Sequence, residues 1–158
     1  MSAAVESLLN KASAAQIADH LLCCDAGFVP SLSGRVEIRD YAQKIASKAT
    51  TFEAWSGGTL VGLAAVYCND QENRIAYITS VSVLKDWACK GIAAGLVGQC
   101  IDHAKASGMR QIRLEVAADN TPAIKLYEGR GFIVGKANRP FVGMNLCLKN
   151  GEEHEQQA

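Results

Sequence analysis

The sequence predicts an α+β fold, with a mixed, mostly antiparallel sheet of six to seven strands and about four flanking helices. Three β-rich segments between residues 51 and 84 follow one another with short turns, which is typical of an antiparallel meander. Residues 77–84, 91–107 and 111–116 then have the patterns of strand, helix and strand. Such a crossover joins two neighbouring parallel strands, so the sheet is expected to be mixed.

The composition predicts one domain without net charge. The 158 residues include 16 basic and 16 acidic side chains, enough chain for one core, and we expect a domain over 1–150 with a polar tail over 151–158. Balanced charge argues against nucleic acid and anionic membranes as partners. Apolar runs are too short to span a bilayer, and the first residues lack the pattern of a signal peptide. We therefore expect a cytoplasmic protein.

Cysteine and histidine are predicted to have no metal or disulfide role. No two cysteines form a Cys-x-x-Cys pair, and most lie in apolar runs, which predicts buried, reduced thiols. The histidines lack ligand spacing and are expected at the surface or on helix flanks. These residues are Cys23, Cys24, Cys68, Cys89, Cys100 and Cys147, and His20, His103 and His154.

The N-terminal third is expected to hold a short edge strand over 5–9 and a helix from the cap Ser13 to about Cys24. Proline, glycine and serine then predict a loop over 28–34. Because this loop is unusually apolar, it is expected either to cover the core or to form one wall of a substrate pocket. The remaining elements before residue 77 are a helix from Ile38 or Asp40, strands over 51–55, 59–67 and 74–84, and a polar loop over 68–73.

The chain is organised around residues 77–98. A strand rich in β-branched residues ends before Lys85, and a helix with one apolar face begins near Gly91. The turn between them consists mainly of small residues, and the first turn of the helix leaves backbone N–H groups without partners. This arrangement predicts an anion site that depends on backbone dipoles and a few lysines.

The C-terminal segment continues the alternation of helices and strands. The helix that begins near Gly91 is expected to stop at Gly108. The next helix is expected to begin at Asp119 or Asn120 and to end at Gly129 or Gly131. Residues 132–134 and 141–148 have the pattern of a closing pair of strands.

Two segments resemble the GNAT superfamily of acyl-CoA-dependent N-acetyltransferases. The run Ala88-Cys89-Lys90-Gly91-Ile92-Ala93 falls on the family's Q/R-x-x-G-x-G/A motif, and residues 114–132 match its L-x-V-x(3)-N-x-x-A-x-x-L-Y-x-x-x-G-F signature nearly throughout. The likeness covers about residues 51–148. It implies that the two parallel strands splay apart, that acetyl-CoA lies in the wedge and that its pyrophosphate lies on the turn.

The first motif departs from the family pattern at two positions. Ala88 stands where Gln or Arg is usual, and Cys89 replaces a common Gly. Both keep their backbone N–H, so the loss is one side-chain contact to the cofactor, a hydrogen bond of about 0.5–1.5 kcal/mol. Lys90 either adds charge beside the phosphates or is a solvated lysine.

By the resemblance, Tyr127 is the general acid that protonates the departing thiolate; the alternative is an aromatic residue of the core. Asn120 holds the pantetheine or caps its helix, or does both. The position that carries the carboxylate acting as general base in some members falls on Tyr77. Glu115 is then the nearest carboxylate in the motifs, with a polar residue of the strand face as its alternative role, and a water chain or an already partly neutral amine would also suffice. The cofactor-binding residues are then Val81, Ser82, Val83, Ala88, Cys89, Lys90, Gly91, Ile92, Ala93, Ala94 and Asn120.

The resemblance implies transfer of an acetyl group from acetyl-CoA to a primary amine by direct attack in a ternary complex. We expect a small acceptor, such as an amino sugar, an amino acid derivative or a drug. A protein N-terminus or lysine, an inactive acyl-CoA-binding regulator and a ligand-free interaction module remain as alternatives, and a homodimer stays open. The candidate acceptor wall consists of Phe28, Pro30, Leu32, Tyr41, Tyr67 and Tyr77.

Overall fold

Within residues 4–28 and 31–148, which the computed structural model describes, seven strands form one sheet in the order β1-β2-β3-β4-β5-β7-β6. Predictions for Pro30, His154 and the tail 151–158 lie outside these residues. The elements are β1 (Glu6–Leu9), α1 (Ala14–Cys24), η1 (Asp25–Gly27), α2 (Ile38–Lys48), β2 (Thr50–Ser56), β3 (Thr59–Asp70), β4 (Ile75–Val83), η2 (Lys85–Trp87), α3 (Ile92–Ala106), β5 (Gln111–Ala117), α4 (Thr121–Gly129), β6 (Ile133–Asn138) and β7 (Phe141–Cys147).

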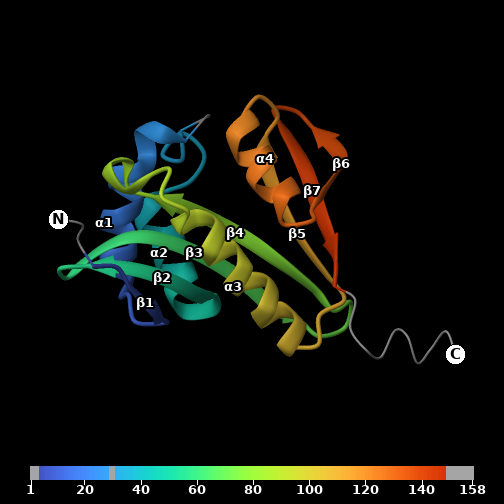
Figure 1. The fold of residues 1–158 in the computed structure, drawn as a ribbon, viewed down its shortest axis with the longest axis horizontal. Coiled ribbons are helices and arrows are strands. Elements are labelled where there is room, and N and C mark those ends of the chain that lie inside the picture. The colour runs from blue at the N-terminus through green and yellow to red at the C-terminus, as the bar shows by residue number, and fades with distance from the viewer. Residues whose placement is uncertain (1–3, 29–30, 149–158) are drawn as a thin grey trace, which may run out of the picture.

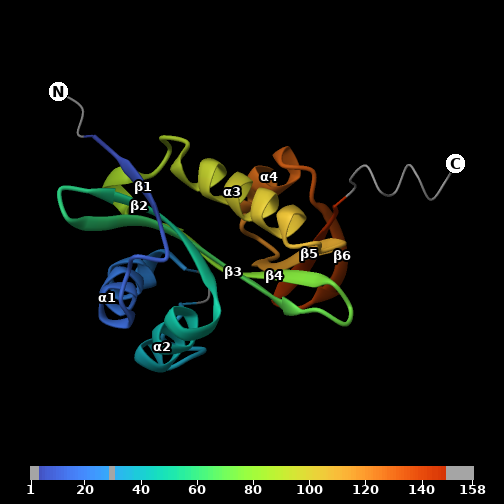
Figure 2. The ribbon, with the colours of Figure 1, turned by 90° about the horizontal axis from the view of Figure 1, so that it is seen from below.

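The predicted fold class is confirmed. In the described part of the chain, β4 and β5 are parallel neighbours, and every other neighbouring pair is antiparallel. Figure 2 shows α1 and α2 on one side of the sheet and α3 and α4 on the other. The sheet therefore divides the apolar core into two clusters, and each cluster lies between one face of the sheet and the helices that cover it.

Helix boundaries follow the capping signals. Ser13 forms a capping box with Gln16 at the start of α1, as the sequence predicts. Glu37 caps α2, which begins at Ile38, and Asn120 caps α4. The loop predicted over 68–73 is partly wrong, because β3 continues to Asp70 and pairs there with Ile75. Polar residues 69–70 resemble a loop in sequence, but Asp70 still pairs with β4, and the carbonyl oxygens of Asn69 and Asp70 accept from Gln71 and Arg74 of the turn.

A β-bulge in β4 separates the two central strands. The partners of Ala65 and Val66 on β3 are Ser80 and Ile78, so Thr79 is an extra residue on β4. The hydroxyl of Tyr41 on α2 donates to the carbonyl oxygen of Thr79 at 2.6 Å. A bulge bends its strand and increases the local twist, and Figure 1 shows β4 and β5 diverging from the end at which they pair.

The parallel pairing is correspondingly short. Residues Ile75–Tyr77 pair with Gln111–Arg113, and the register ends there. Beyond this point, β4 continues to Val83 and β5 to Ala117 without pairing to each other. A wedge therefore opens between the carboxyl halves of the two central strands.

The predicted burial of the cysteines is wrong for most of them. Cys100 is buried, Cys24 and Cys68 are half-buried, and Cys23, Cys89 and Cys147 are exposed. Apolar neighbours in sequence do not decide burial, since adjacent helical or strand residues face different sides.

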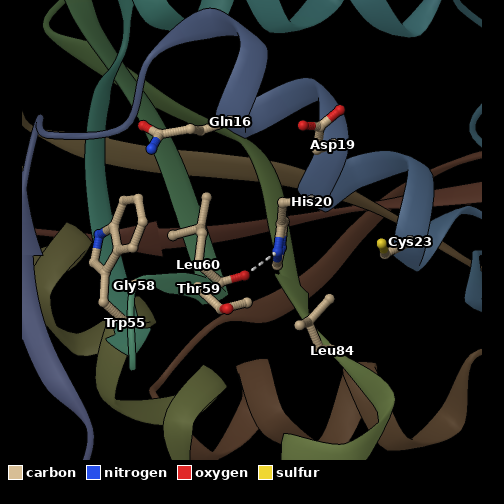
Figure 3. A pocket seen from close by; sticks show the side chains of 9 residues that line it. All are labelled: Gln16, Asp19, His20, Cys23, Trp55, Gly58, Thr59, Leu60 and Leu84. Carbon is tan, nitrogen blue, oxygen red and sulfur yellow. Dashed lines mark hydrogen bonds between the residues drawn. The ribbon is translucent and has the colours of Figure 1, made fainter.

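The surface or helix-flank position predicted for His20 is also wrong, since the side chain lies on the buried face of α1 and is 4% exposed. His20 follows Ile17 by three residues and therefore lies on the same buried face of α1 as Ile17 and Leu21. Its Nδ1 lies 2.9 Å from the carbonyl oxygen of Leu60 (Figure 3), and its Nε2 lies 2.9 Å from the hydroxyl of Ser82. The neutral ring satisfies both contacts by donating from Nδ1 to Leu60 and accepting from Ser82 at Nε2.

The buried His20 predicts a loss of stability in acid. Burial lowers the pKa of His20 below its ordinary value of 6.5, so on acidification the unfolded chain takes up this proton before the folded one. The stabilisation is fully present above about pH 6.5 and is lost as the pH falls through the folded-state pKa. We expect the difference in unfolding free energy between wild type and His20→Asn to be smaller at pH 5 than at pH 7.5, by urea denaturation. A difference that stays constant would contradict this linkage.

Candidate functional site

The turn between β4 and α3 has the backbone shape of an anion site. Cys89 and Gly91 have positive φ values of 62° and 81°, and Gly91 precedes α3 without a side-chain cap. Left-handed backbone and an uncapped helix start leave N–H groups for an anion. The positive φ at Cys89 also gives a physical reason for the glycine that the resembled family favours there. A cavity of about 170 Å³ at this turn is lined by Val83, Trp87, Ala88, Cys89, Gly91, Ile92, Ala93, Ala94 and Leu126.

A second cavity, of about 160 Å³, lies in the wedge between β4 and β5, and we call it the cleft. Elements far apart in sequence form it: the segment before α2, α2 itself, the bulged part of β4, the end of β5, α4 and the start of β7. Its lining residues are Phe28, Leu32, Arg35, Tyr41, Thr79, Ser80, Val81, Glu115, Val116, Ala117, Asn120, Ala123, Tyr127 and Phe141.

The cleft brings together six of the predicted site residues. Tyr127, Asn120 and Val81 line it beside three members of the expected acceptor wall, Phe28, Leu32 and Tyr41. Val83 instead lines the turn cavity, so residues 81–83 of β4 run from the cleft to the turn. Ser82 directs its hydroxyl to His20 of α1. Lys90 is exposed beside the turn.

Tyr127 is the most deeply buried phenol of the cleft, at 9% exposure. Its ring packs edge-on against Phe132, with 5.9 Å between the ring centroids. Burial raises the pKa of Tyr127 to about 12. The side chain is therefore a neutral phenol that carries its proton throughout the physiological pH range.

Asn120 has a capping role: its Oδ1 accepts a hydrogen bond from the backbone N–H of Ala123 at 3.3 Å. The contact caps α4, on which Tyr127 lies about two turns further along. A cofactor contact of Asn120 stays a prediction.

Two members of the expected acceptor wall lie outside the cleft. Tyr67 lies next to Tyr77 across the β3–β4 pair, and its hydroxyl oxygen is buried without a partner among the described residues. Tyr77 lines an adjoining cavity of about 510 Å³, which shares Glu115 with the cleft. Glu115, the candidate carboxylate base, thus lies between the two cavities.

Sequence reasoning missed several residues of the cleft. Arg35 lies in a turn without a motif, and Phe141 comes from the opposite end of the chain. Thr79 lies within a predicted strand, but nothing in its type or spacing indicates the bulge. Only the topology brings these side chains beside Tyr127.

A further cavity, of about 220 Å³, lies between α1 and the β2–β3 hairpin and is lined by His20, Asp19 and Trp55 among others (Figure 3). Both ring nitrogens of His20 already have partners. In the described ranges, no three His, Cys, Asp or Glu residues gather in a way that would hold a metal. No helix of this part of the chain is long and apolar enough to cross a membrane.

Comparison with known proteins places these features in context. Residues 15–132 match the family model described as "Acetyltransferase (GNAT) family". Mycothiol acetyltransferase of Corynebacterium glutamicum strain R is 33% identical over 84 residues, which cover 53% of this chain and 28% of that protein. N-alpha-acetyltransferase 30 of Schizosaccharomyces pombe is 32% identical over 74 residues, which cover 44% of this chain and 49% of that protein. This chain thus spans less than half of either relative.

The same fold occurs in solved structures. PaiA N-acetyltransferase from Thermoplasma acidophilum, solved in complex with coenzyme A, superposes with a TM-score of 0.69 at 15% identity, over 91% of this chain and 99% of that one. At this identity the likeness concerns the fold alone.

Proposed function

Since this chain belongs to the acetyltransferase (GNAT) family, we propose that it is an N-acetyltransferase that moves an acetyl group from acetyl-CoA to a primary amine of a small molecule. The observation that carries the proposal is the wedge itself. It holds a buried, protonated tyrosine, and β4 connects it to a turn with left-handed backbone and to a helix start without a side-chain cap.

The residues present fit acetyl-CoA. The left-handed turn at Cys89 and Gly91 and the start of α3 suit a pyrophosphate. Val81 and Val83 line the two cavities that the pantetheine arm has to connect. When bound, acetyl-CoA supplies the thioester that is the acyl donor.

The chain's own groups then have defined tasks. Backbone N–H groups of residues 81–83 polarise the carbonyl oxygen, and the Tyr127 hydroxyl gives its proton to the leaving sulfur. The acceptor amine must lose a proton to attack. Glu115, which lines the cleft, or water takes that proton.

The size of the cleft supports a small acceptor, because its volume is about 160 Å³ and Phe28, Leu32 and Tyr41 wall it. A protein N-terminus is the second candidate, favoured by the similarity to an N-alpha-acetyltransferase of Schizosaccharomyces pombe. Thiol release from acetyl-CoA, measured with a panel of amines and of peptides, distinguishes them. Binding of CoA without turnover on both panels would point to a regulator instead.

Gly91→Asp tests where the phosphates bind. The new carboxylate would lie at the start of α3 and repel the pyrophosphate. Calorimetry should therefore show that the affinity for CoA falls by a factor of about ten or more. Gly91→Asn is the matched control, because it adds a neutral side chain of the same shape and tolerates positive φ. Equal CoA affinity of wild type and Gly91→Asp would contradict the placement.

A further inference from the structure

Arg35 places a positive charge in the cleft. Its side chain lines the cleft together with Tyr127 and Glu115, and its guanidinium carbon lies 5.1 Å from the ring centroid of Phe141. Arg35 comes from the segment before α2, whereas Phe141 begins β7. Stacking on an aromatic ring orients the planar guanidinium and leaves its N–H edges available to a ligand.

The acidic residues of the same segment are engaged elsewhere. Asp25 accepts hydrogen bonds from the backbone N–H and the hydroxyl of Ser33, at 2.8 and 2.7 Å. Glu37 accepts from the backbone N–H groups of Arg39 and Asp40 at the start of α2. Both carboxylates therefore use their oxygens in local hydrogen bonds, although, besides the hydrogen bonds from Ser33, the charge of the exposed Arg35 also helps to lower the pKa of Asp25. Neither lines the cleft, whose lining carboxylate is Glu115.

The field of this charge reaches the phenols around the cleft. Burial raises the pKa values of Tyr41 and Tyr77, and the positive charge of Arg35 opposes both rises. The charge of Glu115 acts on Tyr77 in the opposite sense. The cleft thus presents a cationic wall and an anionic wall to whatever enters it.

A cation is unfavourable in a site that receives a simple amine, since free primary amines are protonated at neutral pH and would be repelled. We propose that the acceptor is an amine that also carries a carboxylate, as an amino acid does, and that Arg35 binds that carboxylate. The guanidinium fork matches a carboxylate with two parallel hydrogen bonds, and Glu115 faces the amino group. This inference rests on the proposed function and narrows its substrate class.

The alternative is that Arg35 only bridges the α2 segment to β7 through Phe141. Loss of a purely structural bridge would lower the melting temperature and would change kcat/KM by the same factor for acids and for amides. A carboxylate-binding arginine changes KM, and only for acceptors that carry the carboxylate.

The experiment compares free amino acids with the corresponding amino acid amides, which keep the amine and the side chain and lack the carboxylate. Wild type should prefer the acids in kcat/KM, and Arg35→Gln should lower kcat/KM for the acids by about 10- to 100-fold through KM, the value of a charged hydrogen-bonded contact. Amides should be nearly unaffected. Arg39→Gln is the matched control, because it removes an exposed arginine of the same charge from α2.

Binding gives a readout that is independent of turnover. Calorimetry of N-acetyl amino acids and of their amides, with CoA present, should show a preference for the acid in wild type and in Arg39→Gln, and none in Arg35→Gln. Equal affinity for both, no affinity for the acid, or a preference that survives Arg35→Gln would overturn the inference. Failure of the proposed function is a different result, namely no thiol release with any amine, whichever ligand binds.

Discussion

Tyr127→Phe should lower kcat by about 10²- to 10⁴-fold, which is the usual contribution of general acid catalysis, and should leave the affinity for acetyl-CoA almost unchanged. The substitution removes the hydroxyl and keeps the ring, so the edge-on contact with Phe132 survives. Because burial raises the pKa of Tyr127 to about 12, wild type holds the transferable proton at all working pH values. The variant has no group in its place.

Tyr67→Phe is the matched control, since it makes the same change at a tyrosine outside the cleft whose hydroxyl oxygen is buried and unpartnered. We expect kcat close to wild type there, with equal or slightly higher stability, because a buried polar atom without a partner is removed. The melting temperatures of both variants report on packing. If Tyr127→Phe retained kcat with chemistry rate-limiting, water rather than Tyr127 would supply the proton.

Glu53→Ala should cost about 3–5 kcal/mol of unfolding free energy, because several donors lose their acceptor and each buried, unsatisfied donor costs about 1–3 kcal/mol. Glu53 is 0% exposed, and its carboxylate accepts from the N–H groups of Lys11 and Ala12, from Thr51 Oγ1 at 2.5 Å and from Trp55 Nε1 at 2.9 Å. These bonds tie the segment between β1 and α1 to β2. The variant leaves the buried Thr51 hydroxyl and the partly buried N–H groups of Ala12 and Trp55 without this acceptor.

Glu37→Ala is the comparison for this effect. Its carboxylate also accepts from two backbone N–H groups, but at the exposed start of α2, so we expect a cost of about 0.5–2 kcal/mol. Urea denaturation of the two variants measures both values. Equal losses of unfolding free energy in the two variants would contradict a larger contribution from the buried contacts of Glu53.

The sequence by itself determined the elements and their order. β-branched residues over 77–84, the helical periodicity after Gly91 and the alternation in 111–116 predicted a parallel pair, which the structure confirms. Capping signals at Ser13 and at Asp119 or Asn120 predicted the starts of α1 and α4, which the structure places after Ser13 and Asn120. Local patterns suffice for such features, because periodicity, capping and turn residues act over a few neighbouring positions.

The tertiary structure alone decided what meets in the cleft. The β4–β5 pairing ends at Tyr77, just before the bulge at Thr79, which lies in the register against β3 and accepts a hydrogen bond from the Tyr41 hydroxyl. Arg35 and Phe141 are separated by more than a hundred residues, yet they are in contact. His20 is buried because its face of α1 packs on Leu60 and Ser82. Contacts of this kind depend on strand register and on the packing of helices against the sheet, and no local pattern in the chain encodes them.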